Sequence, residues 1–394
     1  MDDTIQNMDN EQLKLRFVSW SSRTLLRGGM RLLGKASFSA QIGWLRAGAR
    51  ILSGVRRHLL QRTHSTHVNI TDDIFAGVPV RVYTATHANA SVTSGCVVYL
   101  HGGAFVFYRS TDFDPFLCQL ARQTGCTVFS IDYRQAPEHP FPAAPDDAER
   151  AFVHLLECAH RRYRVDRRSI VLMGDSAGGN LVAVLTHRMR TKHHHLPRIK
   201  AQVLIYPVTQ AIDMRTASYM QYHEADATER KRHLVSPRFM AIAALTYVGL
   251  EPTEQLIHKV CTNQHVDVDD ARYQIVQRHF INRTSLAGRS FAPHGCDKTL
   301  AQTVQHLMYN PDLSPICFDD FASLPAACVV TVGYDVLKDD GHFYAERLRD
   351  AGVSVEHLHY ERGFHNILMI QCSLSDRIVS DIVHYVKRQF TLCD

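Results

Sequence analysis

IVLMGDSAGGNLVAVLTHRM, residues 170–189, is the stretch that decides the fold. Its first four residues are apolar, as in a buried strand, and the residues from Gly178 onward have the pattern of a helix. The pentapeptide Gly174–Gly178 therefore stands at a strand-to-helix turn, the context of a nucleophile elbow. Glycines flank Ser176 because side chains would clash in so tight a bend. The pattern predicts Ser176 as a nucleophile at a helix start, where the helix dipole favours a developing anion. A chance pentapeptide in a loop would not explain the strand and helix around it.

Other short apolar runs predict further strands. They lie at residues 78–84, 96–100, 127–132, 201–207, 327–333 and 354–360. Most are continuous and rich in β-branched residues, the pattern of strands buried on both faces of a parallel sheet. Helices are predicted between them at 112–123, 143–160, 178–189 and 341–351. This alternation predicts an α/β fold with a mostly parallel central sheet and helices on both faces.

Four parts of the chain are expected. Residues 1–67 are predicted as an N-terminal helical cap segment, because apolar residues there recur at helical steps. Residues 68–207 and 311–394 are expected to form the two parts of a catalytic core. Residues 208–310 have no clear β-run and contain a helical patch at 239–247. So long an insertion, so late in the chain, is expected to cap the carboxyl ends of the strands, where ligands bind.

A glycine-rich turn, His101-Gly102-Gly103-Ala104, follows the predicted strand 96–100. Acyl transfer builds negative charge on the substrate's former carbonyl oxygen, and fixed backbone N–H groups must point at it. We expect Gly102, Gly103 and Ala104 to form the oxyanion hole with Ala177, the donors being the N–H groups of Gly103, Ala104 and Ala177. Taken alone, the turn is also compatible with an ordinary strand-to-helix connection.

Two more strand ends carry candidate catalytic groups. Asp335 follows one predicted strand in Gly333-Tyr334-Asp335, and His365 follows the last in Gly363-Phe364-His365. The chain order Ser, Asp, His is that of α/β-hydrolases. All three residues are expected at the carboxyl edge of the sheet, with His365 as base and Asp335 orienting it. Asp339 and Asp340 are interpreted as helix-start charges or structural partners.

Charge and cysteine patterns bound the location and the partners. The net charge of +5 is mild and does not indicate nucleic-acid binding. Residues 13–67 contain no acid and eleven Lys or Arg, which we interpret as the basic solvated face of helices, with a membrane-surface or targeting segment as the alternative. No run fits a transmembrane helix or signal peptide. Ten scattered cysteines without a CxxC pair favour a reducing compartment, so a cytoplasmic protein is expected.

No metal or organic cofactor is predicted. The sequence has no HExxH motif. His357, His359 and Glu361 alternate along one predicted strand and could share a face, but a solvated strand face is the preferred interpretation of these residues, as a polar loop is of His193–His195.

Taken together, these motifs resemble the hormone-sensitive lipase family of esterases, which includes arylacetamide deacetylase and microbial carboxylesterases. The similar stretches run from Val97 to about Val386 and include HGGAFVF, DYRQAPEHPFPAAP, GDSAGGN, VGYDVLKDDG and GFHNI. The resemblance implies an α/β-hydrolase core with a cap, ester hydrolysis without a cofactor, and Ser176, Asp335 and His365 as the triad. It also implies that residues 132–145 are structural, with buried polar links from Arg134 and Glu138. Two features differ from the family pattern: Ala104 replaces the last glycine of HGGG, and the insertion is longer.

The expected function is a serine carboxylesterase acting on short to medium acyl esters. Its expected partner is a small-molecule ester, without nucleic acid and without stable membrane insertion, and a homodimer is left open. An amidase or deacetylase using the same triad is the first alternative. A non-catalytic ligand-binding protein on the same scaffold is a second, which the presence of all three triad residues argues against. A membrane-associated role of the basic segment is the third.

Overall fold

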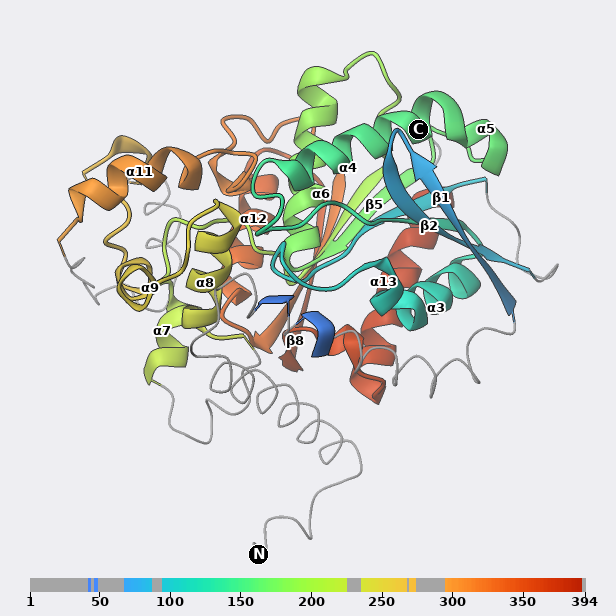
Figure 1. Cartoon of the computed structure of the whole chain (residues 1–394). Helices are drawn as coiled ribbons and strands as arrows, with labels where there is room; N and C mark the ends of the chain where they lie inside the picture. Colours follow the sequence, from blue (N-terminus) through green and yellow to red (C-terminus); the bar gives the residue numbers. More distant parts are fainter. Residues whose placement is uncertain are drawn as a thin grey trace, which may run out of the picture.

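An eight-stranded β-sheet runs through the molecule in the order β1-β2-β4-β3-β5-β6-β7-β8 (Figure 1). The computed structural model describes residues 42–43, 46–48, 67–86, 94–224, 235–267, 269–273 and 295–391. The strands are β1 (Val68–Phe75), β2 (Val78–Ala85), β3 (Cys96–Leu100), β4 (Thr127–Ile131), β5 (Ile170–Asp175), β6 (Ala201–Ile205), β7 (Ala326–Tyr334) and β8 (Val355–Phe364). β2 is antiparallel to β1 and β4, and the remaining neighbours are parallel.

The predicted strands are confirmed, most within two residues of their expected ends. β3, β5 and β6 are buried along their whole length, as continuous apolar strands between two helical layers should be. β8 continues four residues beyond its predicted end. β1 was not predicted as a separate strand, because VNITDDIF is polar and lies at the edge of the sheet.

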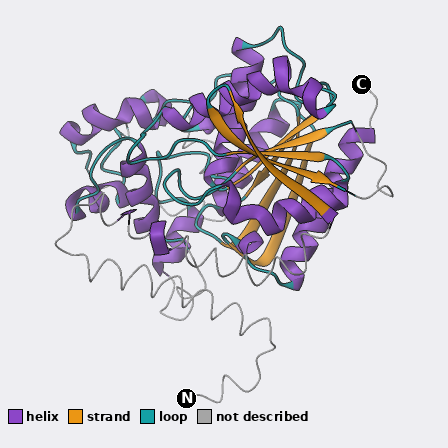
Figure 2. Ribbon diagram, turned by 45° about the vertical axis from the view of Figure 1, so that its right-hand side comes forward, coloured by secondary structure: helices purple, strands orange, loops and turns teal. Residues whose placement is uncertain are grey.

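Helices cover both faces of the sheet (Figure 2). They are α3 (Asp114–Thr124), α4 (Ala143–His154), α5 (His160–Tyr163), α6 (Ala177–Lys192), α12 (Lys338–Asp350) and α13 (Ser373–Thr391). Alternate residues of β3 enter two separate cores: Val98 packs with the cluster that holds α4, α6 and α12, and Val97 with the cluster that holds α3 and α13. The helix predicted over 143–160 is interrupted by a π-helical turn at Leu155–Ala159. α13 was not predicted.

The insertion between β6 and β7 is helical where it is described. It contains α7 (Ala217–Glu224), α8 (Pro237–Tyr247), α9 (Glu254–Cys261) and α11 (Lys298–Met308), and no strand lies among its described residues. α8 begins where Ser236 accepts a hydrogen bond from the Phe239 N–H and Pro237 occupies the first turn. The role of this insertion as a cap stays a prediction.

Most of the expected N-terminal cap segment, 1–67, lies outside the described residues, as do its basic residues apart from Arg46. Within the described ranges, no helix is both long enough and apolar enough to cross a membrane. The described cysteines are free thiols. The cytoplasmic location and the homodimer stay predictions.

Candidate active site

Ser176 forms a strained junction between β5 and α6. Its backbone has φ 54° and ψ −118°, which a residue with a side chain rarely adopts. The surrounding chain holds it there: the Ser176 N–H donates to the Ile205 carbonyl at 2.9 Å, and its carbonyl accepts from Asn180 N–H at 3.2 Å and from Val208 N–H at 3.3 Å. The nucleophile elbow is therefore held by β6 and by the start of the insertion.

The elbow requires glycine where α6 meets β3. A Cβ at Gly178 would lie 1.9 Å from the Leu100 carbonyl oxygen, which is far inside van der Waals contact. The first turn of α6 therefore packs directly on the end of β3, which leads into the His101-Gly102-Gly103 turn. This close approach brings the elbow and the glycine-rich turn together.

Ser176, His365 and Asp335 form one continuous hydrogen-bonded chain. The Nε2 atom of His365 lies 2.9 Å from Ser176 Oγ, and its Nδ1 atom lies 2.8 Å from Asp335 Oδ2. All three side chains are buried. The other carboxylate oxygen, Oδ1, accepts the Leu337 N–H at 2.9 Å, which fixes the carboxylate orientation. A carboxylate at Nδ1 favours the tautomer protonated there, and Nε2 is then able to accept the serine proton.

The turn after β3 presents backbone N–H groups beside the elbow. Gly103 has φ 114° and Ala104 has φ 57°, so this replacement of the family's third glycine adopts the left-handed conformation. Among the described residues, no acceptor is hydrogen-bonded to the N–H groups of Gly103, Ala104 or Ala177. Gly102 differs, because its N–H donates to Asp175 Oδ1 at 2.7 Å. Gly102 therefore supports the turn, and its place among the residues of the oxyanion hole stays a prediction.

Sequence reasoning missed the link from the elbow to this turn. Asp175 is completely buried, and Oδ1 accepts hydrogen bonds from the Gly102 N–H and from the Tyr99 hydroxyl. Burial raises the pKa of the Asp175 carboxyl, and the two hydrogen bonds oppose this increase. Asp175 stands at the variable position of G-x-S-x-G, so the motif itself did not reveal its role.

Asn180 is a second residue that sequence reasoning missed. Its side-chain Nδ2 donates to the Val208 carbonyl at 3.0 Å and to the Leu313 carbonyl at 2.8 Å. Val208 is the first residue of the insertion, and Leu313 lies just past its last residue, 310. One buried side chain on the elbow helix therefore holds both ends of the insertion.

The acidic residues that begin α12 are structural partners, one of the two expected roles. Asp339 Oδ2 accepts the Ser218 N–H at 2.7 Å, and Asp340 Oδ2 accepts the Thr209 N–H at 2.9 Å. Burial raises the pKa of Asp340 to about 8. Both carboxylates tie the insertion to the segment that carries Asp335.

The expected polar links of Arg134 and Glu138 exist, but they are not buried. Arg134 pairs with Asp147 at 2.8 Å and is 45% exposed. Glu138 is 58% exposed and pairs with Arg46 at 2.6 Å. The partner of each is far less exposed, at 2% for Asp147 and 12% for Arg46. The prediction of buried links is therefore wrong for Glu138, and the link of Arg134 is only partly buried.

The histidines of β8 share one face, as the alternation predicted. Thr331 Oγ1 lies 2.8 Å from His357 Nε2 and 2.8 Å from His359 Nδ1, and His359 Nε2 lies 3.0 Å from Glu361 Oε2. In the described part of the chain, no group of three His, Cys, Asp or Glu side chains is arranged to hold a metal ion. His193–His195 lie in a loop after α6.

The sequence and the fold of this chain are both similar to those of known hydrolases. A family described as having the alpha/beta hydrolase fold matches residues 97–266 and 269–369. Human arylacetamide deacetylase-like 4 is 32% identical over 334 residues, which cover 81% of this chain and 78% of that protein. Neutral cholesterol ester hydrolase 1 of Pongo abelii is 32% identical over 320 residues, 77% of this chain and 75% of that protein. Among solved structures, a hyperthermophilic esterase of the archaeon Pyrobaculum calidifontis is 26% identical with a TM-score of 0.62, covering 88% of this chain and 94% of that one.

Proposed function

The chain belongs to the α/β-hydrolase fold family, and we propose that it cleaves short to medium acyl esters through Ser176, His365 and Asp335. Its relatives include arylacetamide deacetylase-like proteins and neutral cholesterol ester hydrolases. It is a carboxylic ester hydrolase, in agreement with the family resemblance of its motifs. The observation that carries the proposal is the hydrogen-bonded chain from Ser176 Oγ through His365 to Asp335.

The proposed reaction has two halves. In the first, His365 Nε2 accepts the Ser176 proton while Oγ attacks the ester carbonyl, and the alcohol leaves with that proton. In the second, His365 takes a proton from water while the water oxygen attacks the acyl carbonyl, and His365 then returns that proton to Ser176 Oγ as the acid leaves. Asp335 holds the histidine ring and stabilises its cation in both halves.

The developing oxyanion would be bound by the backbone N–H groups of Gly103, Ala104 and Ala177. Two observations support this role of the three N–H groups. Among the described residues no acceptor is bonded to them, and the Gly102 N–H holds the turn to Asp175. A lost oxyanion donor typically costs about 3 kcal/mol of transition-state stabilisation. Each donor of this turn would therefore contribute about 10²-fold to the rate.

Amide cleavage is the second candidate. Relatives of this chain are named arylacetamide deacetylases, whose name describes an amide substrate. The same triad serves both reactions, but an amine leaves only after His365 has protonated it. The identity of the leaving group, and not that of the nucleophile, separates the two candidates.

The test measures hydrolysis of p-nitrophenyl esters from acetate to dodecanoate beside p-nitroacetanilide. Wild type is compared with Ser176→Ala and with Ser94→Ala, a control at an exposed serine. We expect wild type and Ser94→Ala to cleave acetate to octanoate esters, and Ser176→Ala to lose at least about 10³-fold in kcat/KM.

Each result has a consequence. Preference for the anilide over every ester would replace the proposal by the deacetylase function. An active Ser176→Ala would refute the assigned nucleophile. A folded wild type without activity on either class would favour the ligand-binding alternative.

A further inference from the structure

The loop that follows the glycine-rich turn has an unusual backbone. Gly103, Ala104, Phe105 and Tyr108 have φ of 114°, 57°, 59° and 67°. Three of these residues carry side chains, for which a left-handed backbone costs about 1–2 kcal/mol each. Such a loop keeps its shape only when the surrounding structure holds it.

Hydrogen bonds to the carbonyl groups of this loop provide that support. Gly103 O accepts from the Phe107 N–H at 2.7 Å, and Phe105 O accepts from the Ala136 N–H at 3.0 Å. Gln135 Nε2 donates to Phe107 O at 3.0 Å and to Tyr108 O at 2.8 Å. All these donors belong to the loop itself or to the segment after β4.

Arg46 provides a further contact from a distant part of the chain. Its Nε donates to the Val106 carbonyl at 2.7 Å, and Nη2 donates to the Ala136 carbonyl. Its Nη1 lies 2.6 and 2.7 Å from the two carboxylate oxygens of Glu138. One guanidinium group therefore joins the loop of the oxyanion turn to the segment after β4.

The Arg46 side chain is built into the fold and is not part of a solvated basic face. It is 12% exposed, although Arg46 lies in the segment predicted to present basic residues to solvent. Ile42, four residues earlier in the chain, is buried in the main core cluster.

We propose that Arg46 is a positioning residue for the oxyanion turn, so that the N-terminal segment supports transition-state binding. The inference rests on the proposed function. Without Arg46, the Val106 carbonyl loses its charged donor, and the Gly103 and Ala104 N–H groups lose a fixed position relative to Ser176. Arginine suits the role because its planar fork donates in three directions at once, whereas a lysine ammonium is a single point.

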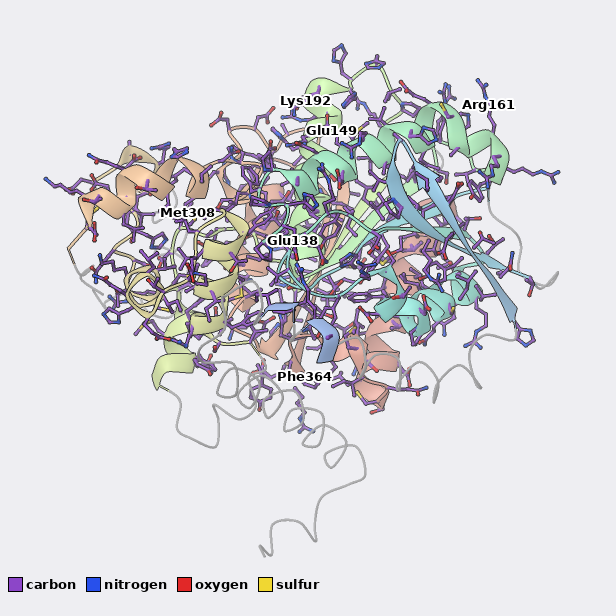
Figure 3. All side chains as sticks on the ribbon, in the orientation of Figure 1. Glu138, Glu149, Arg161, Lys192, Met308 and Phe364 are labelled. Atoms are coloured by element: carbon purple, nitrogen blue, oxygen red, sulfur yellow. The ribbon has the colours of Figure 1, made fainter. Side chains whose placement is uncertain are left out.

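Steady-state kinetics on a p-nitrophenyl ester test this proposal with Arg46→Met and Arg46→Lys. Arg161→Met is the matched control, because Arg161 is an exposed arginine on α5, far from Glu138 in Figure 3. We expect Arg46→Met to lower kcat about tenfold with KM within about twofold, since oxyanion donors act mainly in the transition state. Arg46→Lys should recover part of the loss, and Arg161→Met should equal wild type.

Glu138→Gln separates the two halves of the contact. It removes the ion pair but leaves both carbonyl bonds of Arg46, so kcat should stay within about twofold of wild type. A loss equal to that of Arg46→Met would show that the ion pair, and not the bond to the loop, carries the effect, and would overturn the proposal.

Amide hydrogen exchange tests the contact without any substrate. The Val106 and Phe107 N–H groups bond to the Gly103 carbonyl, so their exchange should become faster in Arg46→Met and not in Arg161→Met. Unchanged exchange and unchanged kcat in Arg46→Met would refute the inference. A wild type that hydrolyses no ester would refute the proposed function instead, and the exchange result would still decide the role of Arg46.

Discussion

Asp335 uses its two carboxylate oxygens for different tasks, and this predicts the effect of replacing it. Oδ2 accepts from His365, and Oδ1 accepts from the Leu337 N–H. In Asp335→Asn the amide oxygen can keep the Leu337 bond while the NH₂ group faces Nδ1 of His365. The ring would then carry its proton on Nε2 and could not accept from Ser176. We expect kcat to fall about 10⁴-fold with an unchanged melting temperature, measured by ester hydrolysis and circular dichroism. A loss of less than tenfold would contradict the role of Asp335.

Gly103 and Ala104 should respond in opposite ways to substitution. A Cβ at Gly103 would lie 2.1 Å from the Phe107 carbonyl oxygen, and its φ of 114° suits only glycine. Gly103→Ala should therefore displace the turn and lower kcat/KM by about 10² or more. Ala104→Gly relieves a left-handed alanine but adds unfolded-state entropy, so stability should change by less than about 1 kcal/mol and activity should persist. Urea denaturation and ester kinetics check both variants. A fully active Gly103→Ala would show that the turn tolerates movement.

Helix α8 contacts the loop that follows the glycine-rich turn through two ring pairs, Tyr247 with Phe105 and Phe239 with Phe107. The rings of Tyr247 and Phe105 are parallel within 2° with centroids 3.8 Å apart, and Phe141 meets Tyr247 edge-on at 5.7 Å. The Tyr247 hydroxyl is buried without a hydrogen-bond partner among the described residues. The ring, and not the hydroxyl, therefore makes the contribution.

The matched pair Tyr247→Phe and Tyr247→Ala tests this contact. Tyr247→Phe should be neutral or slightly stabilising, because it removes an unpaired buried hydroxyl. Tyr247→Ala leaves a cavity beside Phe105 and should lower the free energy of unfolding by about 3–5 kcal/mol, together with kcat. Chemical denaturation and ester kinetics measure both effects. Equal stability of the two variants would show that the stack contributes nothing.

The elements that sequence could predict are those whose burial leaves a continuous apolar pattern. CVVYL and AQVLI were recognisable as strands because both faces are covered. β1 was not, because an edge strand such as VNITDDIF has a polar outer face. The three residues of the proposed triad were recognisable because each follows a strand end. The supports of the oxyanion turn were not, since Asp175 and Gly102 lie 73 residues apart and Arg46 and Val106 lie 60 apart, and only tertiary packing brings them together.

At the scale of the whole molecule, stability should depend on the proton of Asp340. Its pKa is raised to about 8 by burial, whereas the unfolded chain releases this proton near 4. Between these values the folded state holds more protons than the unfolded state, so stability falls as pH rises. The contribution of Asp340 to this slope is about 1.4 kcal/mol per pH unit.

Asp340→Asn should remove that contribution. The variant also loses the hydrogen bond from Gln210 Nε2, and this loss lowers the free energy of unfolding by the same amount at every pH. The change in slope therefore comes from the missing carboxyl proton alone. Urea denaturation from pH 5 to pH 8 should show a steeper decline for wild type and for the exposed control Asp319→Asn than for Asp340→Asn. Parallel curves for all three proteins would mean that Asp340 does not hold its proton in the folded state.

The attachment of the insertion to Asn180 has a consequence for how such a protein can change over generations. Val208 and Leu313 stand about a hundred residues apart in the chain, yet the same amide group binds both. Asn180 on α6 thus fixes how far apart Val208 and Leu313 lie. That separation does not depend on the length or the sequence of the chain between them. Lengthening a closed loop adds little entropic cost. Substitutions and additions between Val208 and Leu313 can therefore accumulate while both residues keep their attachment to α6.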